Sequence, residues 1–182
     1  MAQSGTSPPS WPSFARQVIA CAVRGSDPAS VPPAAVASRP HAGVFVTLHQ
    51  RRMLRGCMGI LDPGLSLADA VRQAAVCAAL QDPRFTSVRA QELDELEIEV
   101  SILSPPVPMR SLDDLQIGRH GILVQRQGRR GLFLPQVAVE HRLDKETFLS
   151  RCCAEKAGLP ADAWRHPDTE VLLFTAEVLR ET

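Results

Sequence analysis

The chain has 182 residues, of which 45% are hydrophobic and 22% charged, and its 20 basic residues balance its 20 acidic residues. This length and composition suit one globular domain, or two closely packed subdomains, with ample apolar material for a core. Zero net charge and 4% aromatic content argue against nucleic-acid binding, which needs basic and stacking side chains. No apolar run approaches the roughly 18 residues of a membrane span, so we expect no membrane anchor.

The five cysteines are odd in number, and no two of them are spaced as C-x-x-C. Such a set indicates reduced thiols in a cytoplasmic protein, not a disulfide framework or a zinc ribbon. The histidines show no H-x-x-H or H-E-x-x-H spacing, so the sequence predicts no metal site and implies no cofactor. Only two of the 20 basic residues are lysines, a bias that suggests a GC-rich bacterial genome.

The amino-terminal residues 1–12 are polar and contain proline, and they lack the basic and apolar regions of a secretory signal. We predict a disordered tail over 1–12 and a single domain over 13–181. A helix is expected to begin near Ser13 and to end at Gly25, because apolar residues recur between them at helical spacing. Residues 26–42 contain several prolines and are predicted to form an extended connector.

Two short runs of alternating residues, 44–48 and 53–58, predict a β-hairpin with its turn at residues 50–52. An S-x-x-D sequence beginning at Ser66 matches a helix capping box, and apolar spacing then predicts a helix to about Leu80.

The remaining predicted elements are strands at 96–103, 122–125, 131–134 and 171–179 and a helix at 145–157. The strand at 96–103 has the clearest alternation, and the prolines after Ser104 must end it. Helices and strands are mixed without a regular β-α-β order, which favours an α+β fold over a doubly wound sheet.

The most informative segment is Leu54-Arg55-Gly56-Cys57-Met58-Gly59. Its two glycines flank the cysteine and permit a sharp turn or the close approach of a ligand. Arg55 can lower the pKa of the Cys57 thiol or bind an anion. The same residues also fit a small, buried, unreactive cysteine.

This segment resembles the L-R-G-C-I-G hallmark of the AMMECR family, with Met58 in place of the family's usual isoleucine. The similarity continues in the same order over residues 14–181, through Val44–Leu48, Asp82–Phe85, Leu96–Pro106, Gly118–Ile122, Leu134–Ala138 and Lys156–Pro160. The resemblance implies a two-lobed α+β fold, with a larger mixed lobe, a smaller lobe and a cleft lined by the L-R-G-C-x-G segment.

The resemblance also implies a biological context. Microbial members of the family are protein A of a gene system that includes a Memo-type protein and a radical-SAM enzyme. A shared pathway with these two proteins is therefore expected, although the resemblance identifies no substrate and fold alone never does.

Several other residues are candidates for the site. Glu97 and Glu99 point to the same face of their predicted strand. That face is either simply exposed to solvent, or it lines the cleft and Glu99 acts as a base near Cys57. His120 lies in a predicted turn, where it is either exposed or a second candidate base.

Two further residues have a structural and a functional interpretation. Arg84 follows a helix stop and either lies at the cleft or is simply exposed. Gln136 follows a strand end and either hydrogen-bonds a ligand or caps the next helix.

Two functions follow, and we favour the first. In one, the protein is an accessory component that binds a small anion, a peptide or a partner protein through Arg55, Gly56, Met58, Gly59, Arg84 and Gln136. In the other, it is an enzyme with Cys57 as the nucleophile, Arg55 as its electrostatic partner and Glu99 or His120 as the base.

Overall fold

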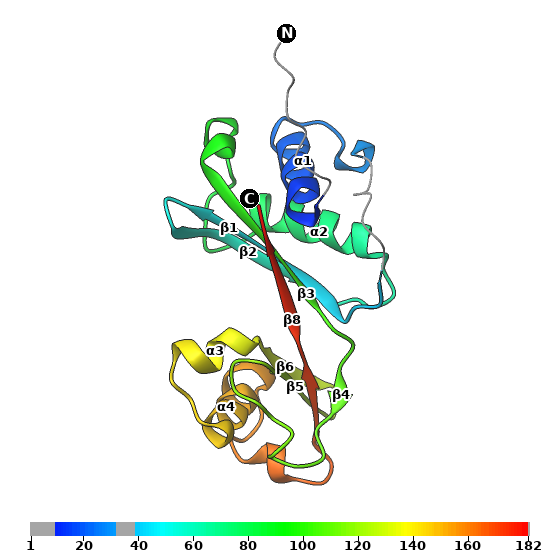
Figure 1. The fold of residues 1–182 in the computed structure, drawn as a ribbon, viewed down its shortest axis with the longest axis vertical. Coiled ribbons are helices and arrows are strands. Elements are labelled where there is room, and N and C mark those ends of the chain that lie inside the picture. The colour runs from blue at the N-terminus through cyan, green and yellow to red at the C-terminus, as the bar shows by residue number, and fades with distance from the viewer. Residues whose placement is uncertain (1–9, 32–38, 182) are drawn as a thin grey trace. The chain divides into compact units, whose positions relative to one another are not determined.

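The computed structural model of the protein describes residues 10–31 and 39–181. The chain divides into two compact units, Met1–Ile102 with Glu177–Thr182 and Leu103–Ala176, so the division does not fall in the proline-containing connector (Figure 1). Each unit has its own sheet with antiparallel strands and its own hydrophobic cluster. The α+β class is therefore confirmed, whereas cooperative unfolding of residues 13–181 as one domain stays a prediction.

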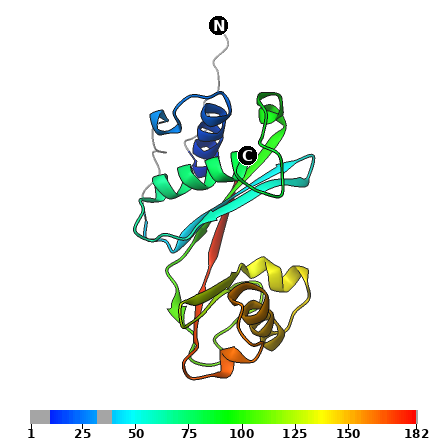
Figure 2. The same ribbon diagram turned by 180° about the vertical axis from the view of Figure 1, so that it is seen from behind.

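The first unit contains a four-stranded sheet with the order β2-β1-β3-β8. Its strands are β1 (Gly43–Gln50), β2 (Met53–Ile60), β3 (Leu96–Leu103) and β8 (Ala176–Arg180). Its helices are α1 (Trp11–Val23), α2 (Leu67–Leu80) and the short 3-10 helices η1 (Pro28–Ser30) and η2 (Ala90–Glu95). Both α1 and α2 lie on the same face of this sheet (Figures 1 and 2).

Strand alternation divides β1 between the two faces of this sheet. Val44, Val46 and Leu48 are fully buried and belong to the cluster that α1 and α2 close. Phe45 and Thr47 point to the opposite face, where they are half-buried. The face opposite the helices therefore carries Phe45 and the polar side chain of Thr47.

The hairpin predicted between residues 44 and 58 is confirmed, and its turn is formed by Arg51 and Arg52. Both residues have a left-handed backbone, with φ of 51° and 64°. Two successive residues of this kind are typical of a type I′ turn, whose twist matches the twist of the two strands it joins.

Helix α1 begins earlier than predicted. The Ser10 hydroxyl accepts a hydrogen bond from the Ser13 amide (3.3 Å), and Pro12 lies in the first turn, where a helix does not need its N–H. Trp11 is only 4% exposed. Trp11 and Pro12 therefore belong to α1, with Ser10 as its N-cap. Residues 1–9 and 32–38 lie outside the described residues, so the disordered tail stays a prediction.

The second unit contains a sheet with the order β4-β7-β5-β6. Its strands are β4 (Val107–Pro108), β5 (Gly121–Arg126), β6 (Arg129–Phe133) and β7 (Glu170–Phe174). Its helices are α3 (Pro135–Glu140), α4 (Lys145–Arg151), the π-helical η3 (Cys152–Ala157) and η4 (Ala163–Arg165). The helix predicted over 145–157 is thus α4 continued by η3, and it ends at Gly158 with a left-handed φ of 65°.

The last predicted strand, 171–179, is in fact two strands. β7 ends at Phe174 and β8 begins at Ala176, and the two belong to different sheets. The Ser104 amide donates to the Thr175 carbonyl (2.9 Å), and the Thr175 amide donates to the Ser104 hydroxyl (3.0 Å). These hydrogen bonds between distant residues fix the break between β7 and β8 at Thr175. The apolar pattern of the sequence continues across this break, so it does not indicate where one strand ends and the next begins.

Candidate functional site

Cys57 lies in β2, directly opposite Thr47 of β1. Its Sγ is 3.3 Å from the Thr47 Oγ1, and its side chain is half-buried. β2 is an edge strand of its sheet, so in the part of the chain that the structure describes no further strand covers the outer side of its backbone at this residue. Other groups can therefore reach the amide and the carbonyl of Cys57.

Asp82 and Arg84 bind this outer edge. The Cys57 amide donates to Asp82 Oδ2 (2.9 Å), and Arg84 Nη2 donates to the Cys57 carbonyl (3.2 Å). Arg84 also donates to the Asp82 carboxylate from its backbone amide (3.1 Å), from Nε (3.0 Å) and from Nη2 (2.7 Å). We call Asp82, Arg84 and the Cys57 backbone the Asp82–Arg84 clamp.

The two charged side chains of the clamp differ strongly in exposure. The Asp82 side chain is 2% exposed and the Arg84 side chain 55%. Hydrogen bonds from the Arg84 side chain, and then from the backbone amides of Cys57 and Arg84, hold the pKa of Asp82 well below its usual range despite its burial. The guanidinium also lies 5.5 Å from the centre of the Phe85 ring. Arg84 is thus held in one orientation beside Cys57 while much of it faces solvent.

The other arginine of the segment is directed elsewhere. The register between β1 and β2 shifts after Leu48, so Arg55 has no partner on β1 and forms a β-bulge. Its guanidinium donates to both carboxylate oxygens of Glu92 (2.8 and 3.1 Å) and to the Thr86 carbonyl (2.9 Å). The Arg55 side chain is 13% exposed. Arg84 and not Arg55 is therefore the arginine that contacts Cys57.

The remaining residues of the segment lie on both faces of β2. A Cβ at Gly56 would lie 2.3 Å from the Ala78 carbonyl oxygen of α2, and Met58 packs against the core cluster. Gly59 leaves room for the Phe45 ring, since a Cβ there would lie 2.4 Å from it. Gly56 and Met58 thus contact the helical side, while Gly59 shares the opposite face with Phe45.

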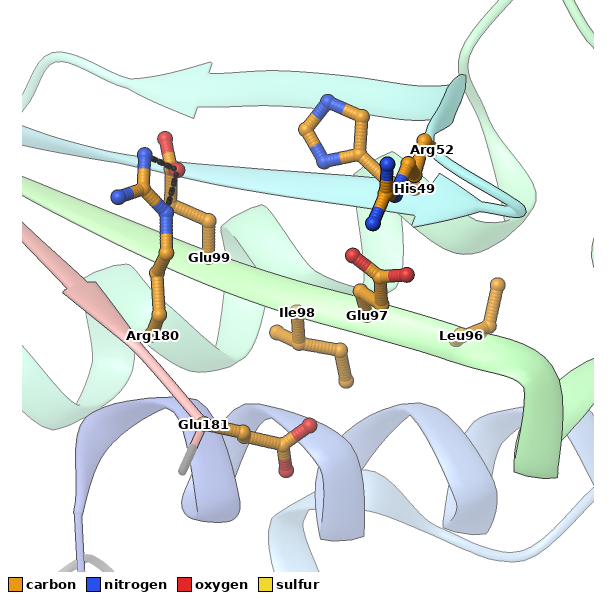
Figure 3. A pocket seen from close by; sticks show the side chains of 8 residues that line it. All are labelled: His49, Arg52, Leu96, Glu97, Ile98, Glu99, Arg180 and Glu181. Atoms are coloured by element: carbon orange, nitrogen blue, oxygen red, sulfur yellow. Dashed lines mark hydrogen bonds and ion pairs between the residues drawn. The ribbon is translucent and has the colours of Figure 1, made fainter.

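Glu99 lies on β3 and lines a cavity of about 480 Å³ in the first unit (Figure 3). Arg180 donates to the Glu99 carboxylate from Nε (2.9 Å), and Figure 3 marks this ion pair. Among the described residues, the hydrogen-bond partner of Glu99 is thus Arg180, not Cys57. Glu97 and His49 line the same cavity.

His120 and Gln136 belong to the second unit. His120 Nδ1 accepts a hydrogen bond from the Gln116 amide (3.2 Å). Gln136 lies in the first turn of α3, directly after Pro135, and is half-buried. Both residues thus belong to a different unit from Cys57.

Sequence reasoning missed two residues of the site, Thr47 and Asp82. For Asp82 a signal was available, because a carboxylate stands two residues before an arginine directly after an apolar helix. Thr47 carried no such signal, since its partner on β2 depends on the bulge. The clamp therefore joins residues that are 25 positions apart in the chain.

The described residues also bear on metals and membranes. Within them, no three histidine, cysteine or acidic side chains are grouped in a way that could hold a metal ion. No helix in these same ranges has the length and hydropathy needed to cross a bilayer.

We expect Cys57 to react with iodoacetamide faster than Cys77, Cys152 and Cys153. Burial raises the pKa of Cys152 to about 12 and also raises the pKa of Cys77 and Cys153. The thiolate is the nucleophile, and burial both disfavours it at Cys152 and keeps the reagent away, whereas Cys57 is only half-buried. Cys152 should therefore react more than about tenfold slower than Cys57. Mass spectrometry of peptides after brief labelling at neutral pH measures the order, and equal rates for Cys57 and Cys152 would contradict it.

Comparison with known proteins gives consistent matches. Residues 12–179 match the family model described as AMMECR1. A protein of Thermococcus gammatolerans is 47% identical over 149 residues, which cover 76% of this chain and 72% of the relative. Protein NEQ441 of Nanoarchaeum equitans is 38% identical over 175 residues, 92% of this chain and 97% of that protein.

A solved structure also matches. The crystal structure of uncharacterized protein PH0010 from Pyrococcus horikoshii has a TM-score of 0.80 and 38% identity, and the match covers 94% of this chain and 89% of that chain. The three source organisms are archaea, so these relatives give no support to the bacterial source that the arginine bias suggested.

Proposed function

This chain belongs to the AMMECR1 family, and we propose that it acts as an accessory binding component. In this proposal, Arg84 binds an anionic group of a small ligand or a partner protein beside Cys57. The observation that carries the proposal is the Asp82–Arg84 clamp, in which a buried carboxylate orients a guanidinium that is 55% exposed.

The clamp prepares Arg84 for binding. Asp82 accepts from Nε and Nη2, and the Cys57 carbonyl also accepts from Nη2, so the guanidinium plane is fixed before any ligand arrives. A donor that is already ordered loses less conformational entropy on binding. Asp82 offsets the positive charge and the clamp uses Nε and Nη2, so we expect a carboxylate or phosphate to be held by directed, charge-assisted hydrogen bonds from Nη1.

We extend the proposal to the partner. The family resemblance supports a Memo-type protein or a radical-SAM enzyme of the same gene system, or a small anion or peptide from their common pathway. A cytoplasmic location belongs to the same proposal, and the five free cysteines support it because thiols stay reduced there.

The alternative function is an enzyme that uses Cys57 as its nucleophile. It needs a base within about 3 Å of the thiol. Among the described residues, the hydrogen-bond partner of Sγ is the Thr47 hydroxyl, which is not a base at neutral pH. Glu99 pairs with Arg180, and His120 accepts from a backbone amide. The geometry therefore supports binding better than catalysis.

Two substitutions distinguish these functions. Arg84→Lys keeps a cation beside Asp82 but loses the planar fork, so we expect it to weaken binding about tenfold, as for loss of one charge-assisted hydrogen bond. Cys57→Ser keeps the size of the side chain and should change the affinity less than about twofold. Calorimetric titration with the purified Memo-type protein and then the radical-SAM enzyme measures both effects.

The matched control is Arg89→Lys, a substitution at an exposed arginine of the same unit. The enzyme alternative predicts the reverse order, with Cys57→Ser abolishing turnover of the reconstituted pathway and Arg84→Lys only slowing it. Wild-type affinity for both partners in all three variants, with normal pathway output, would refute both functions.

A further inference from the structure

The hairpin of β5 and β6 carries three arginines, Arg126, Arg129 and Arg130, around a tight turn. The turn residues Gln127 and Gly128 have left-handed φ values of 49° and 78°. The register places Arg126 directly opposite Arg129. Arg126 and Arg129 are therefore direct cross-strand neighbours, whose Cβ atoms typically lie about 5 Å apart.

Like charges directly opposite each other destabilise a hairpin unless something compensates them. Within the described ranges, no carboxylate forms an ion pair with Arg126, Arg129 or Arg130. Arg129 Nη1 donates to the Gly158 carbonyl (2.6 Å), whereas the buried Nε of Arg126 has no hydrogen-bond partner among these residues. The positive charge of the pair is thus only partly compensated.

The three arginines line a cavity of about 360 Å³, and Asp168 and Glu170 line it as well. Glu170 accepts a hydrogen bond from Gln125 Nε2, and in the described ranges neither carboxylate forms an ion pair with these arginines. Three guanidinium groups against two carboxylates leave one excess positive charge at the cavity, and the Arg126 Nε has no hydrogen-bond partner among these residues.

We propose that this cavity binds a dianionic phosphoryl group, as free phosphate or as a phosphate monoester. Such a group carries close to two negative charges and three acceptor oxygens, so it can accept from two guanidinium forks at once. A carboxylate has one charge and two oxygens, so it offers two guanidinium forks less charge and fewer acceptor sites than a phosphoryl group does. This site lies in the second unit and does not depend on the role of Arg84 in the first.

The first test is a titration of the full chain followed by NMR of the arginine Nε–Hε signals, with ionic strength held constant by chloride. Inorganic phosphate at slightly alkaline pH should shift the Arg126 and Arg129 signals to saturation, with a dissociation constant of about 1 mM. Phenyl phosphate binding more tightly than phosphate would identify a monoester site, and equal affinity a free-phosphate site. Acetate and the monoanion dimethyl phosphate should each bind at least about tenfold more weakly.

The second test uses variants. Arg126→Gln and Arg129→Gln should each weaken phosphate binding about tenfold or more. Arg110→Gln, which removes the same charge from an exposed residue of the same unit, should not change it. Phosphate should raise the melting temperature of the wild type but not that of Arg126→Gln, whose melting temperature in chloride should exceed that of the wild type because the like-charge pair is gone.

Three results would overturn the proposal. One is the absence of saturable shifts with either phosphate or phenyl phosphate. Another is a loss of phosphate affinity in Arg110→Gln as large as that in Arg126→Gln and Arg129→Gln, which would show that phosphate responds to the overall charge of the protein and not to this cavity. The third is equal binding of acetate, which would show that a phosphoryl group is not preferred.

Discussion

Gly56→Ala is expected to lower the free energy of unfolding of the first unit by about 3 kcal/mol. A Cβ at this position would lie 2.3 Å from the carbonyl oxygen of Ala78 and 3.6 Å from the Leu48 side chain. The close atom belongs to the backbone of α2, which cannot turn away as a side chain can. β2 and α2 would have to separate, and that would open the packing between sheet and helix.

Two other glycines serve as matched controls for this substitution. A Cβ at Gly59 would meet the Phe45 ring at 2.4 Å, but this half-buried side chain can move, so Gly59→Ala should cost only about 1 kcal/mol. Gly64 is exposed, with its closest contact 3.2 Å away, on the Asp62 side chain, so Gly64→Ala should be nearly neutral. Urea denaturation measures all three, and an equal stability of Gly56→Ala and Gly64→Ala would contradict the close approach of β2 to α2.

Asp82→Asn is expected to lower the free energy of unfolding by about 2–3 kcal/mol at neutral pH. This loss is somewhat smaller than that for breaking a fully buried ion pair, because Arg84 remains hydrated. The asparagine keeps the volume of the side chain but loses the charge and one of the two acceptor oxygens. The Cys57 amide and the Arg84 guanidinium then compete for a single oxygen. Urea denaturation gives the loss, and Asp94→Asn, at an exposed carboxylate of the same unit, is the control.

The cost of Asp82→Asn should also depend on pH in a defined direction. The pKa of Asp82 is held below its usual range in the folded protein, so its ionised form stabilises the fold. This stabilisation is complete above the unfolded pKa of about 4 and is lost as the pH falls through the lower folded pKa. The stability difference between wild type and Asp82→Asn should therefore shrink as the pH is lowered below about 4.

Other carboxylates with lowered pKa values, such as Glu92, also lose stabilising charge in acid. They are present in both proteins, so their contribution cancels in the difference. A difference that stays constant from neutral pH into acid would show that Asp82 is not an ionised partner of Arg84.

Much of the fold could be predicted from the sequence, because the relevant signals are local. Alternation with a period of two, followed by a serine and two prolines, predicts strand 96–103, and β3 has these bounds. Ser66 caps α2 by accepting from the Asp69 amide (3.1 Å), as the S-x-x-D sequence indicates. Asp144 caps α4 in the same way, accepting from the Thr147 amide (2.7 Å). Neighbouring residues contain all the information that these elements need.

The candidate site was less predictable, because it depends on register and on distant residues. Counting back from the two-residue turn without a bulge would pair Cys57 with Val46, but the bulge at Arg55 pairs it with Thr47. That shift moves the thiol beside a hydroxyl on the other face of the sheet. Local sequence patterns are enough to assign Cys57 and Arg84 to the protein's most distinctive segments. The contact of Arg84 with Cys57 and the pairing of Arg55 with Glu92 depend on the fold, because a bulge and a buried carboxylate direct these side chains.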